Sequence, residues 1–214
     1  MNDKKITKKL EKINKLIAEN NAAFKKATKA QKRVMIAQDV LAQIKAKRYV
    51  AESGRWVVPT FSENFCNTDD YPGRESVQQL FASKEIESCN VCALGGLFMS
   101  CTNLNNHTTY DQFNDESEDI GSLIGYEEGL SNELDVFFSK NQLTLIEIYF
   151  EDGNGYFSID NETVDTGSHF YKSIDFDHVN SFNDKYQYDD DRLKAIMKNI
   201  VENNGTFVPE KLKV

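Results

Sequence analysis

Apolar and small side chains recur every three or four positions through the first 44 residues of the chain. They fall at Ile6, Leu10, Ile13, Ile17, Phe24, Ala27, Ala30, Val34, Ala37, Leu41 and Ile44. Such steps place side chains on one face of a helix. No glycine or proline occurs before Gly54, which favours helix further. Because Asn20-Asn21 interrupts the stripe, the pattern predicts either one helix of about 45 residues, about 65 Å long, or two helices that meet at the asparagines.

The middle of the chain predicts a hairpin followed by helices. RYVAESGRWVV, residues 48–58, is typical of two short strands around Ser53-Gly54. Trp56 is interpreted as a core anchor of this hairpin, with a binding platform as the alternative. Residues 76–83 predict a short helix. ESCNVCALGGLFMSCTNL, residues 87–104, predicts a core helix in which Gly95-Gly96 permits close packing against a neighbour.

The C-terminal half predicts further helices between acidic loops. Residues 106–129 form a long, acidic stretch, and Ser131 can cap a helix through Phe138. Ser139 and Gln142 form a capping-box pattern before a helix that ends at Gly153. Residues 154–188 predict irregular structure with one strand pair. Three aspartates, residues 189–191, then begin a final helix that ends at 204–205. The predicted fold class is α+β, mostly α.

Charge divides the chain into two unequal parts. Residues 1–49 hold 14 Lys/Arg against 4 Asp/Glu, whereas residues 50–214 hold 11 against 30, and the net charge is −9. We therefore expect a basic helical extension over residues 1–48 and an acidic globular domain, a compact helical body with long acidic loops, over residues 49–214. A single helix of about 65 Å would exceed the diameter of such a domain, so its first half is predicted to form a homo-oligomer. A solvated basic face and direct nucleic-acid binding are the alternatives.

Composition narrows the classes of partner and compartment. The N-terminus is basic but has no apolar stretch behind it, which argues against a secretory signal. The longest apolar run, residues 91–99, is about half of the roughly 20 residues that a bilayer requires. We expect a cytoplasmic protein with reduced cysteines and no membrane association. The acidic body would repel nucleic acid and attract basic proteins.

Four cysteines invite a chemical interpretation. Cys89 and Cys92 have the spacing of a metal or redox pair, with Cys101 nearby and Cys66 further away. A structural zinc site needs a second ligand pair, which is missing, so buried core thiols are the main prediction. The alternatives are a metal or redox site, or a Cys89 nucleophile with a histidine base at 107, 169 or 178.

Two acidic segments resemble metal-binding patterns. YFEDGNGYFSIDNE echoes a calcium loop, but Phe150 and Asn161 occupy two of its anchoring positions, so a turn after a helix is the main interpretation. Asp175, Asp177 and His178 could hold Mg²⁺ or Mn²⁺. The glycine-rich, P-loop, HExxH and GxSxG motifs are absent from the sequence. We therefore predict no catalytic residue, no metal site and no cofactor.

Charged side chains and one aromatic side chain remain as candidate binding residues. They are Lys25, Lys26, Lys29, Lys32, Arg33, Arg55, Trp56, Asp69, Asp70, Asp189, Asp190 and Asp191.

Three blocks of the sequence resemble segments of known proteins. RVMIAQDVLAQIKAKRYVAESGRWV, CNVCALGGLFMS and RLKAIMKNIVENNGTFVP resemble blocks in small proteins of tailed bacteriophages and prophages. The blocks span roughly residues 33–58, 89–100 and 192–209. This resemblance implies a phage accessory protein in the cytoplasm of a bacterial host, and it implies no particular activity or site residue.

Three hypotheses for function follow from these patterns. The first is a non-catalytic phage-type accessory protein that binds and modulates a host macromolecule, with a host protein as the expected partner and inhibition of a bacterial defence component as one form. The second is an oligomeric sponge that sequesters a nucleotide-like signalling molecule, for which the body offers few cations, among them Arg55, Arg74, Lys84 and Lys140. The third is a cysteine- or metal-dependent hydrolase.

Overall fold

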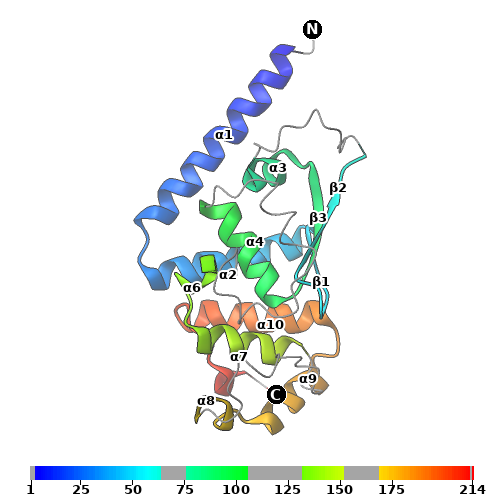
Figure 1. Ribbon diagram of the computed structural model, residues 1–214. Coiled ribbons are helices and arrows are strands. Elements are labelled where there is room, and N and C mark those ends of the chain that lie inside the picture. Colours follow the sequence, from blue (N-terminus) through cyan, green and yellow to red (C-terminus); the bar gives the residue numbers. More distant parts are fainter. Residues whose placement is uncertain (1–2, 64–75, 106–131, 152–168, 213) are drawn as a thin grey trace.

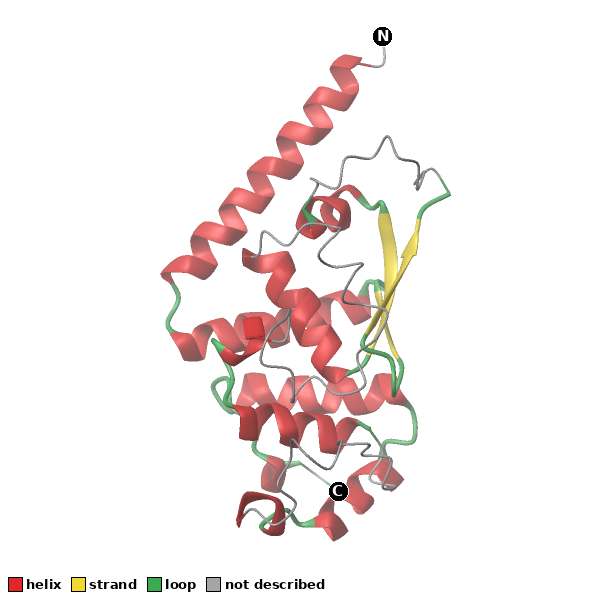
Figure 2. Ribbon diagram, in the orientation of Figure 1, coloured by secondary structure: helices red, strands yellow, loops and turns green. Residues whose placement is uncertain are grey.

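The computed structural model describes residues 3–63, 76–105, 132–151, 169–212 and 214, and it shows an α+β fold that is mostly helical (Figures 1 and 2). For residues 3–7, 9, 10, 132, 133 and 171 it describes the backbone alone. The helices are α1 (Asp3–Lys26), α2 (Lys29–Lys45), α3 (Val77–Ser83), α4 (Ala93–Asn105), α6 (Asn132–Asp135), α7 (Lys140–Phe150), α8 (His169–Lys172), α9 (Phe176–Lys185), α10 (Asp189–Glu202) and the 3-10 helix η1 (Pro209–Lys211). The strands are β1 (Tyr49–Ala51), β2 (Val57–Phe61) and β3 (Ile86–Val91).

The N-terminal stripe forms two helices, and the break lies seven residues after the predicted one. α1 continues through Asn20-Asn21 to Lys26, and α2 begins at Lys29. Thr28 ends α1 because it caps α2: its hydroxyl accepts from the Gln31 amide at 3.3 Å, and its own amide donates to the Gln31 side chain at 2.9 Å. The T-x-x-Q pattern is therefore the stop signal, whereas Asn20 and Asn21 remain helical.

The sheet has the strand order β1-β3-β2, so the predicted hairpin is wrong although both of its strands exist. β3 lies between them, parallel to β1 with Tyr49 opposite Cys89 and antiparallel to β2 with Val57 opposite Val91. Residues 86–91 were predicted to lie mostly within a core helix. They form the central strand instead, and the helix begins only at Ala93.

α4 packs against the sheet through its paired glycines. A Cβ atom at Gly95 would lie 1.7 Å from the Trp56 carbonyl oxygen, so only glycine permits this approach. Trp56 is 8% exposed, and its ring packs 5.2 Å from that of Phe98 on α4. The interpretation of Trp56 as a core anchor is confirmed, and so is the close packing predicted at the glycine pair.

The helices form layers below the sheet and α4. α10 packs on both α2 and α7, with α9 against α7 on the far side (Figure 1). Each contributes an apolar face to one core; α2 provides Ile36, Ala37, Val40 and Ile44. α1 contributes Phe24 from its last turns, whereas its N-terminal half extends away from the other helices (Figures 1 and 2). The predicted boundary at residue 48 stays a prediction.

The remaining C-terminal predictions have mixed outcomes. Ser139 caps α7 as predicted, accepting from the Gln142 amide at 3.3 Å, although α7 ends at Phe150 rather than at Gly153. The final helix, α10, is confirmed. Within residues 169–188 the prediction of irregular structure is wrong, because α8 and α9 occupy this stretch. The predicted acidic loop at 106–129, the Ser131 cap and residues 154–168 lie outside the described residues.

Candidate functional site

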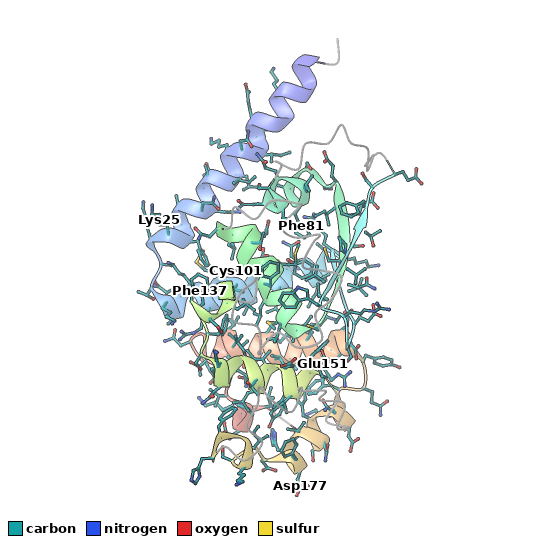
Figure 3. All side chains as sticks on the ribbon, viewed as in Figure 1. Lys25, Phe81, Cys101, Phe137, Glu151 and Asp177 are labelled. Carbon is teal, nitrogen blue, oxygen red and sulfur yellow. The ribbon has the colours of Figure 1, made fainter. Side chains whose placement is uncertain are left out.

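Five predicted binding residues come together where α1 meets α2, and we call them the basic elbow: Lys25, Lys26, Lys29, Lys32 and Arg33. Lys25 and Lys26 end α1, and the other three occupy the first turns of α2. The Thr28 cap holds the two helices in this arrangement. Figure 3 shows Lys25 at the outer edge of the molecule, with Phe137 on the body below it.

Two members of the basic elbow are anchored to the body. The Arg33 guanidinium donates to the carbonyl oxygens of Gly205 at 2.5 Å and Phe137 at 3.1 Å. The Lys32 ammonium lies 5.4 Å from the ring centre of Phe24 and 5.8 Å from that of Phe137. Gly205 has a φ of +86°, and a Cβ there would lie 2.6 Å from a carbonyl oxygen of α2, so a glycine is required where Arg33 is received.

The other three lysines of the elbow are exposed. Lys25, Lys26 and Lys29 face solvent, and within the described parts of the chain no member of the elbow forms an ion pair with a carboxylate. These three lysines are therefore candidate contacts for an anionic ligand or partner.

Two open hollows flank the elbow. The first has a volume of about 410 Å³ and is lined by Asn21, Ala22, Lys25, Lys32 and Asn105. The second, of about 300 Å³, is lined in part by Lys29, Arg33, Asp135, Ser139 and Gln142. Each hollow thus receives two cations of the elbow, and the second also receives the Asp135 carboxylate. This arrangement suits anionic groups, such as carboxylates or phosphates, more than apolar ligands.

A part-buried polar network holds α1 to the body beside the first hollow. The Gln78 side chain on α3 donates to the Asn21 side chain at 2.8 Å and to the Asn103 carbonyl at 2.7 Å. The Asn103 amide in turn donates to both carboxylate oxygens of Asp39, each at 3.2 Å. Burial raises the pKa of Asp39, against hydrogen bonds from Gln43, Ser100 and Asn103 that lower it. Asn21, one of the expected helix breakers, is therefore a tether.

The three cysteines in the described parts of the chain do not form a reactive centre. Cys89, Cys92 and Cys101 are buried at 0, 7 and 2% exposure, as predicted, but only Cys101 lies on a helix, α4; Cys89 lies on β3, and Cys92 immediately precedes α4. Burial raises the pKa of the Cys89 thiol to about 12, and it raises that of Cys92 further still. Since the thiolate is the nucleophile, neither thiol is prepared for catalysis. Cys66 and His107 lie outside the described residues.

The acidic residues near His178 serve α9 rather than a common site. The Asp175 carboxylate accepts from the His178 backbone amide at 3.0 Å as the helix cap, and Asp177 is exposed (Figure 3). The His178 ring instead contacts the Tyr149 hydroxyl, 2.9 Å from Nδ1. In the described parts of the chain, no group of three His, Cys, Asp or Glu side chains could hold a metal ion. The calcium-loop pattern begins at Phe150, which is buried, and continues outside the described residues.

Three carboxylates, at the end of α7 and the start of α10, bind the end of β1 and the connection from β1 to β2, and we call them the carboxylate latch: Glu151, Asp189 and Asp190. Asp190 accepts from the Ala51 amide at 3.0 Å, Asp189 from Ser53 at 2.7 Å and Glu151 from Gly54 at 2.7 Å. Arg192, 5% exposed, forms an ion pair with Asp189. Of the predicted binding residues, Asp189 and Asp190 are thus engaged within the fold.

Glu147 and Glu151 stand one turn apart on α7, and sequence reasoning missed both. The pKa of Glu147 is raised to about 7, mainly by burial and then by the Glu151 charge. Burial also raises the pKa of Glu151 to about 7, followed by the opposing effect of the Gly54 amide. The available signal was two glutamates four residues apart within the apolar segment LIEIYFE.

The remaining predicted binding residues are scattered. Arg55 is exposed and pairs with Glu52 at 3.3 Å, whereas Trp56 is buried in the core. Asp191 pairs with Lys194 at 3.5 Å. Asp69 and Asp70 lie outside the described residues.

Comparisons of the chain with protein-family models, with curated proteins and with solved structures found no match. No helix in the described parts of the chain combines the length and the apolar character needed to cross a bilayer.

Proposed function

We propose that this chain is a non-catalytic accessory protein that binds and modulates a partner protein with an acidic surface, through the basic elbow and the adjoining lysines of α1. The observation that carries the proposal is the set of exposed elbow lysines beside two hollows, with no carboxylate paired to them among the described residues. Cations held on a rigid, capped turn speed the encounter with an acidic surface and orient it.

A protein is favoured over nucleic acid as the partner because of the charge of the rest of the chain. Residues 50–214 hold 30 Asp/Glu against 11 Lys/Arg. Such a body repels a phosphate backbone that approaches the elbow at moderate salt. The resemblance to phage and prophage proteins supports a bacterial host protein, in the host cytoplasm, as the partner. A component of bacterial defence that the chain inhibits is one form of this proposal.

The proposal can be tested by affinity capture from a bacterial lysate at low and moderate salt. Three baits are compared: the unsubstituted chain, a variant with elbow lysines reversed in charge, and a control variant with two other lysines reversed. We expect the full chain to recover a stoichiometric acidic protein, and direct titration of that protein to reproduce the binding. The bait Lys25→Glu/Lys29→Glu should lose it. The control Lys172→Glu/Lys198→Glu, which reverses two exposed lysines away from the elbow, should keep it.

Three results of the capture would contradict the proposal. The first is recovery of no stoichiometric partner at either salt concentration. The second is equal recovery by the elbow-reversed bait, which would place the contact elsewhere. The third is material that disappears on nuclease treatment, which would make the partner a nucleic acid.

The hollows favour a second candidate function, a sponge for a small nucleotide-like ligand. The first hollow, about 410 Å³, falls within the size range of small-ligand sites, and Lys25 and Lys32 would supply the cations for phosphate. Mass spectrometry of the supernatant from denatured protein should then reveal a copurified phosphorylated molecule that Lys25→Glu/Lys29→Glu protein does not carry. A clean supernatant from the unsubstituted chain would exclude a ligand bound tightly enough to copurify.

A further inference from the structure

The second hollow beside the elbow contains an arginine that is held in place without using all of its hydrogen-bond donors. A guanidinium group has five N–H donors. One donor of Arg33 binds the Gly205 carbonyl oxygen at 2.5 Å, and another binds that of Phe137 at 3.1 Å. Within the described parts of the chain, Arg33 has no other hydrogen-bond acceptor and no ion pair. The remaining three donors of this half-buried cation can therefore bind a ligand.

The walls of this hollow are joined by hydrogen bonds between distant parts of the chain. The Gln142 side chain, which lines the hollow, donates to the Phe207 carbonyl oxygen at 3.1 Å and accepts from the Phe207 amide at 2.7 Å. The Gln142 amide donates to the Ser139 hydroxyl at 3.3 Å. The hollow, of about 300 Å³, is thus formed before a ligand arrives, and its volume lies at the lower end of the range for small-ligand sites.

The donors that line the hollow favour a phosphate group over a carboxylate. Lys29 adds a second cation, and Ser139 and Thr206 add two residues with hydroxyl groups. Together with Arg33 they offer more donors than the two oxygens of a carboxylate accept. A phosphate group has three acceptor oxygens and a charge of about −1.5 to −2, and arginine binds it through parallel N–H bonds.

One carboxylate, that of Asp135, also lines the hollow. It is exposed and forms no ion pair within 4.0 Å with Lys29 or Arg33, so it does not neutralise the two cations. This carboxylate repels a bare dianion and attracts a positively charged group. Asp135 therefore favours a ligand in which a phosphate is joined to an amine, because only such a ligand satisfies both signs of charge.

We propose that the second hollow binds a small phosphorylated amine, with its phosphate on Arg33 and Lys29 and its ammonium group toward Asp135. This site goes beyond the proposed function, since it requires neither a partner protein nor the first hollow. The two surfaces share Lys29, so their tests are designed to be read separately.

NMR titration of the full chain, labelled with ¹⁵N, tests the site with three probes: phosphoethanolamine, inorganic phosphate and acetate. At constant ionic strength, phosphoethanolamine should shift the amide signals of residues around the hollow, such as Thr206. We expect a dissociation constant of about 1 mM, the order that a ligand of so few atoms can reach. Inorganic phosphate should bind about threefold more weakly, because Asp135 repels it without compensation, and acetate more weakly again.

Substitutions of the lining residues should change binding in opposite directions. Lys29→Gln should raise the dissociation constant of phosphoethanolamine about fivefold, and the fold should persist because this side chain is exposed. Arg33→Lys keeps the charge but loses the fixed guanidinium, and should weaken binding about tenfold. Asp135→Asn should instead strengthen the binding of inorganic phosphate about threefold while it weakens that of phosphoethanolamine.

The matched control is Lys172→Gln, at an exposed lysine of α8 that does not line the hollow. It should leave the dissociation constant of each probe unchanged. Equal weakening by Lys29→Gln and Lys172→Gln would indicate diffuse attraction to the whole surface and would overturn the site.

Further results would contradict the proposal. Absence of shifts around the hollow with every probe would overturn the site. Tighter binding of acetate than of the two phosphate probes would exclude phosphate as the ligand group. Inorganic phosphate that binds as tightly as phosphoethanolamine would overturn the role of Asp135 and of the amine.

The site and the proposed function can fail separately. A chain that binds phosphoethanolamine in the hollow but captures no acidic partner would support the site and contradict the proposed function. A chain that captures such a partner but binds none of the probes would overturn the site and leave the proposed function in place.

Discussion

At the basic elbow, cations stand at the end of α1 and in the first turns of α2, and three of the five face solvent. At the carboxylate latch, on the other side of the body, the acids also stand at helix ends, but each accepts a backbone amide from the last residue of β1 or from the β1–β2 connection. Figure 3 shows this separation, with Lys25 and Glu151 on opposite sides of the molecule. The two regions use charge differently: the latch uses it to join layers of the fold, whereas Lys25, Lys26 and Lys29 of the elbow pair with no carboxylate among the described residues.

The difference matters for how the acidic excess is interpreted. A count of charges suggests that every carboxylate of the body contributes to a negative surface. Asp189 and Asp190 do not do so freely, because backbone amides, and for Asp189 also Arg192, already engage them. If this comparison is correct, substitutions at the latch reduce stability, whereas substitutions of the exposed elbow lysines affect binding alone.

The largest effect is expected from Arg192→Met. This change removes the cation that faces Asp189 and leaves the carboxylate part-buried, so we expect the free energy of unfolding to fall by about 3 kcal/mol. Chemical denaturation followed by circular dichroism measures it. Lys15→Met, at the exposed pair with Glu19 on α1, is the control and should cost less than about 0.5 kcal/mol. Equal losses in the two variants would mean that the latch is no more structural than a surface ion pair.

Arg33→Gln should have the next largest effect, because Arg33 is the elbow residue that behaves like the latch. The substitution loses the charge-assisted bonds to the carbonyl oxygens of Gly205 and Phe137, and we expect a loss of about 2 kcal/mol in the free energy of unfolding. The melting temperature should fall in parallel. Stability equal to that of the unsubstituted chain would show that Arg33 is as free as its neighbours.

Glu147→Gln tests whether the buried carboxyl beside the latch makes the stability of the chain depend on pH. The usual pKa of 4.5 is raised to about 7 in the fold, so the folded chain binds more protons than the unfolded chain between these values. This contribution to stability is complete below about pH 4.5 and is lost as the pH rises through about 7. We therefore expect Glu147→Gln to add about 1 kcal/mol to the free energy of unfolding at pH 8. It should also flatten the decline in stability between pH 5 and pH 8.

The control for this pH series is Glu202→Gln, at an exposed carboxylate of α10. Its denaturation curves at pH 5 and pH 8 should match those of the unsubstituted chain. If Glu147→Gln left the pH dependence of stability unchanged, the carboxyl pair would have no role in it.

The smallest effect is expected from neutralising the exposed elbow lysines. Lys25→Gln/Lys26→Gln/Lys29→Gln should change the free energy of unfolding by no more than about 0.5 kcal/mol, because these side chains have no ion-pair partner among the described residues. Calorimetry measures the change. A large loss would show that the elbow, like the latch, holds the fold together.

Local signals predicted the elements that depend on local physics. Aspartates 189–191 followed by an amphipathic run indicated α10, and Ser139 indicated the start of α7, because caps and helix dipoles act within one turn. Thr28 and Gln31 held the same kind of signal, which was overlooked in favour of Asn20-Asn21. Asn21 lies within α1, and its side chain accepts a hydrogen bond from Gln78, which is 57 residues away in the sequence. No local pattern shows such a partner.

The sequence predicts that the cations of the basic elbow lie close together, but it does not predict which backbone groups the carboxylates of the latch bind. Lys25, Lys29 and Lys32 stand on neighbouring turns of two helices, so their proximity follows from their spacing. Glu151 meets Gly54 across 97 residues, which no spacing reveals. The binding role of the three lysines stays a prediction. The helix predicted over residues 87–91 was wrong for a related reason. An apolar run is compatible with a buried strand as well as with a buried helix, and here the pairing with the distant strands β1 and β2 makes it a strand.

The order of strands in the sheet has a consequence for how the chain folds. During synthesis, residues 49–51 and 57–61 emerge well before residues 86–91, which must later separate them. Until then both segments have an unsatisfied edge, and the turn at Gly54 brings them toward each other. We therefore expect the hairpin that the sequence suggests to compete with the native sheet until residues 86–91 are available to pair with both segments.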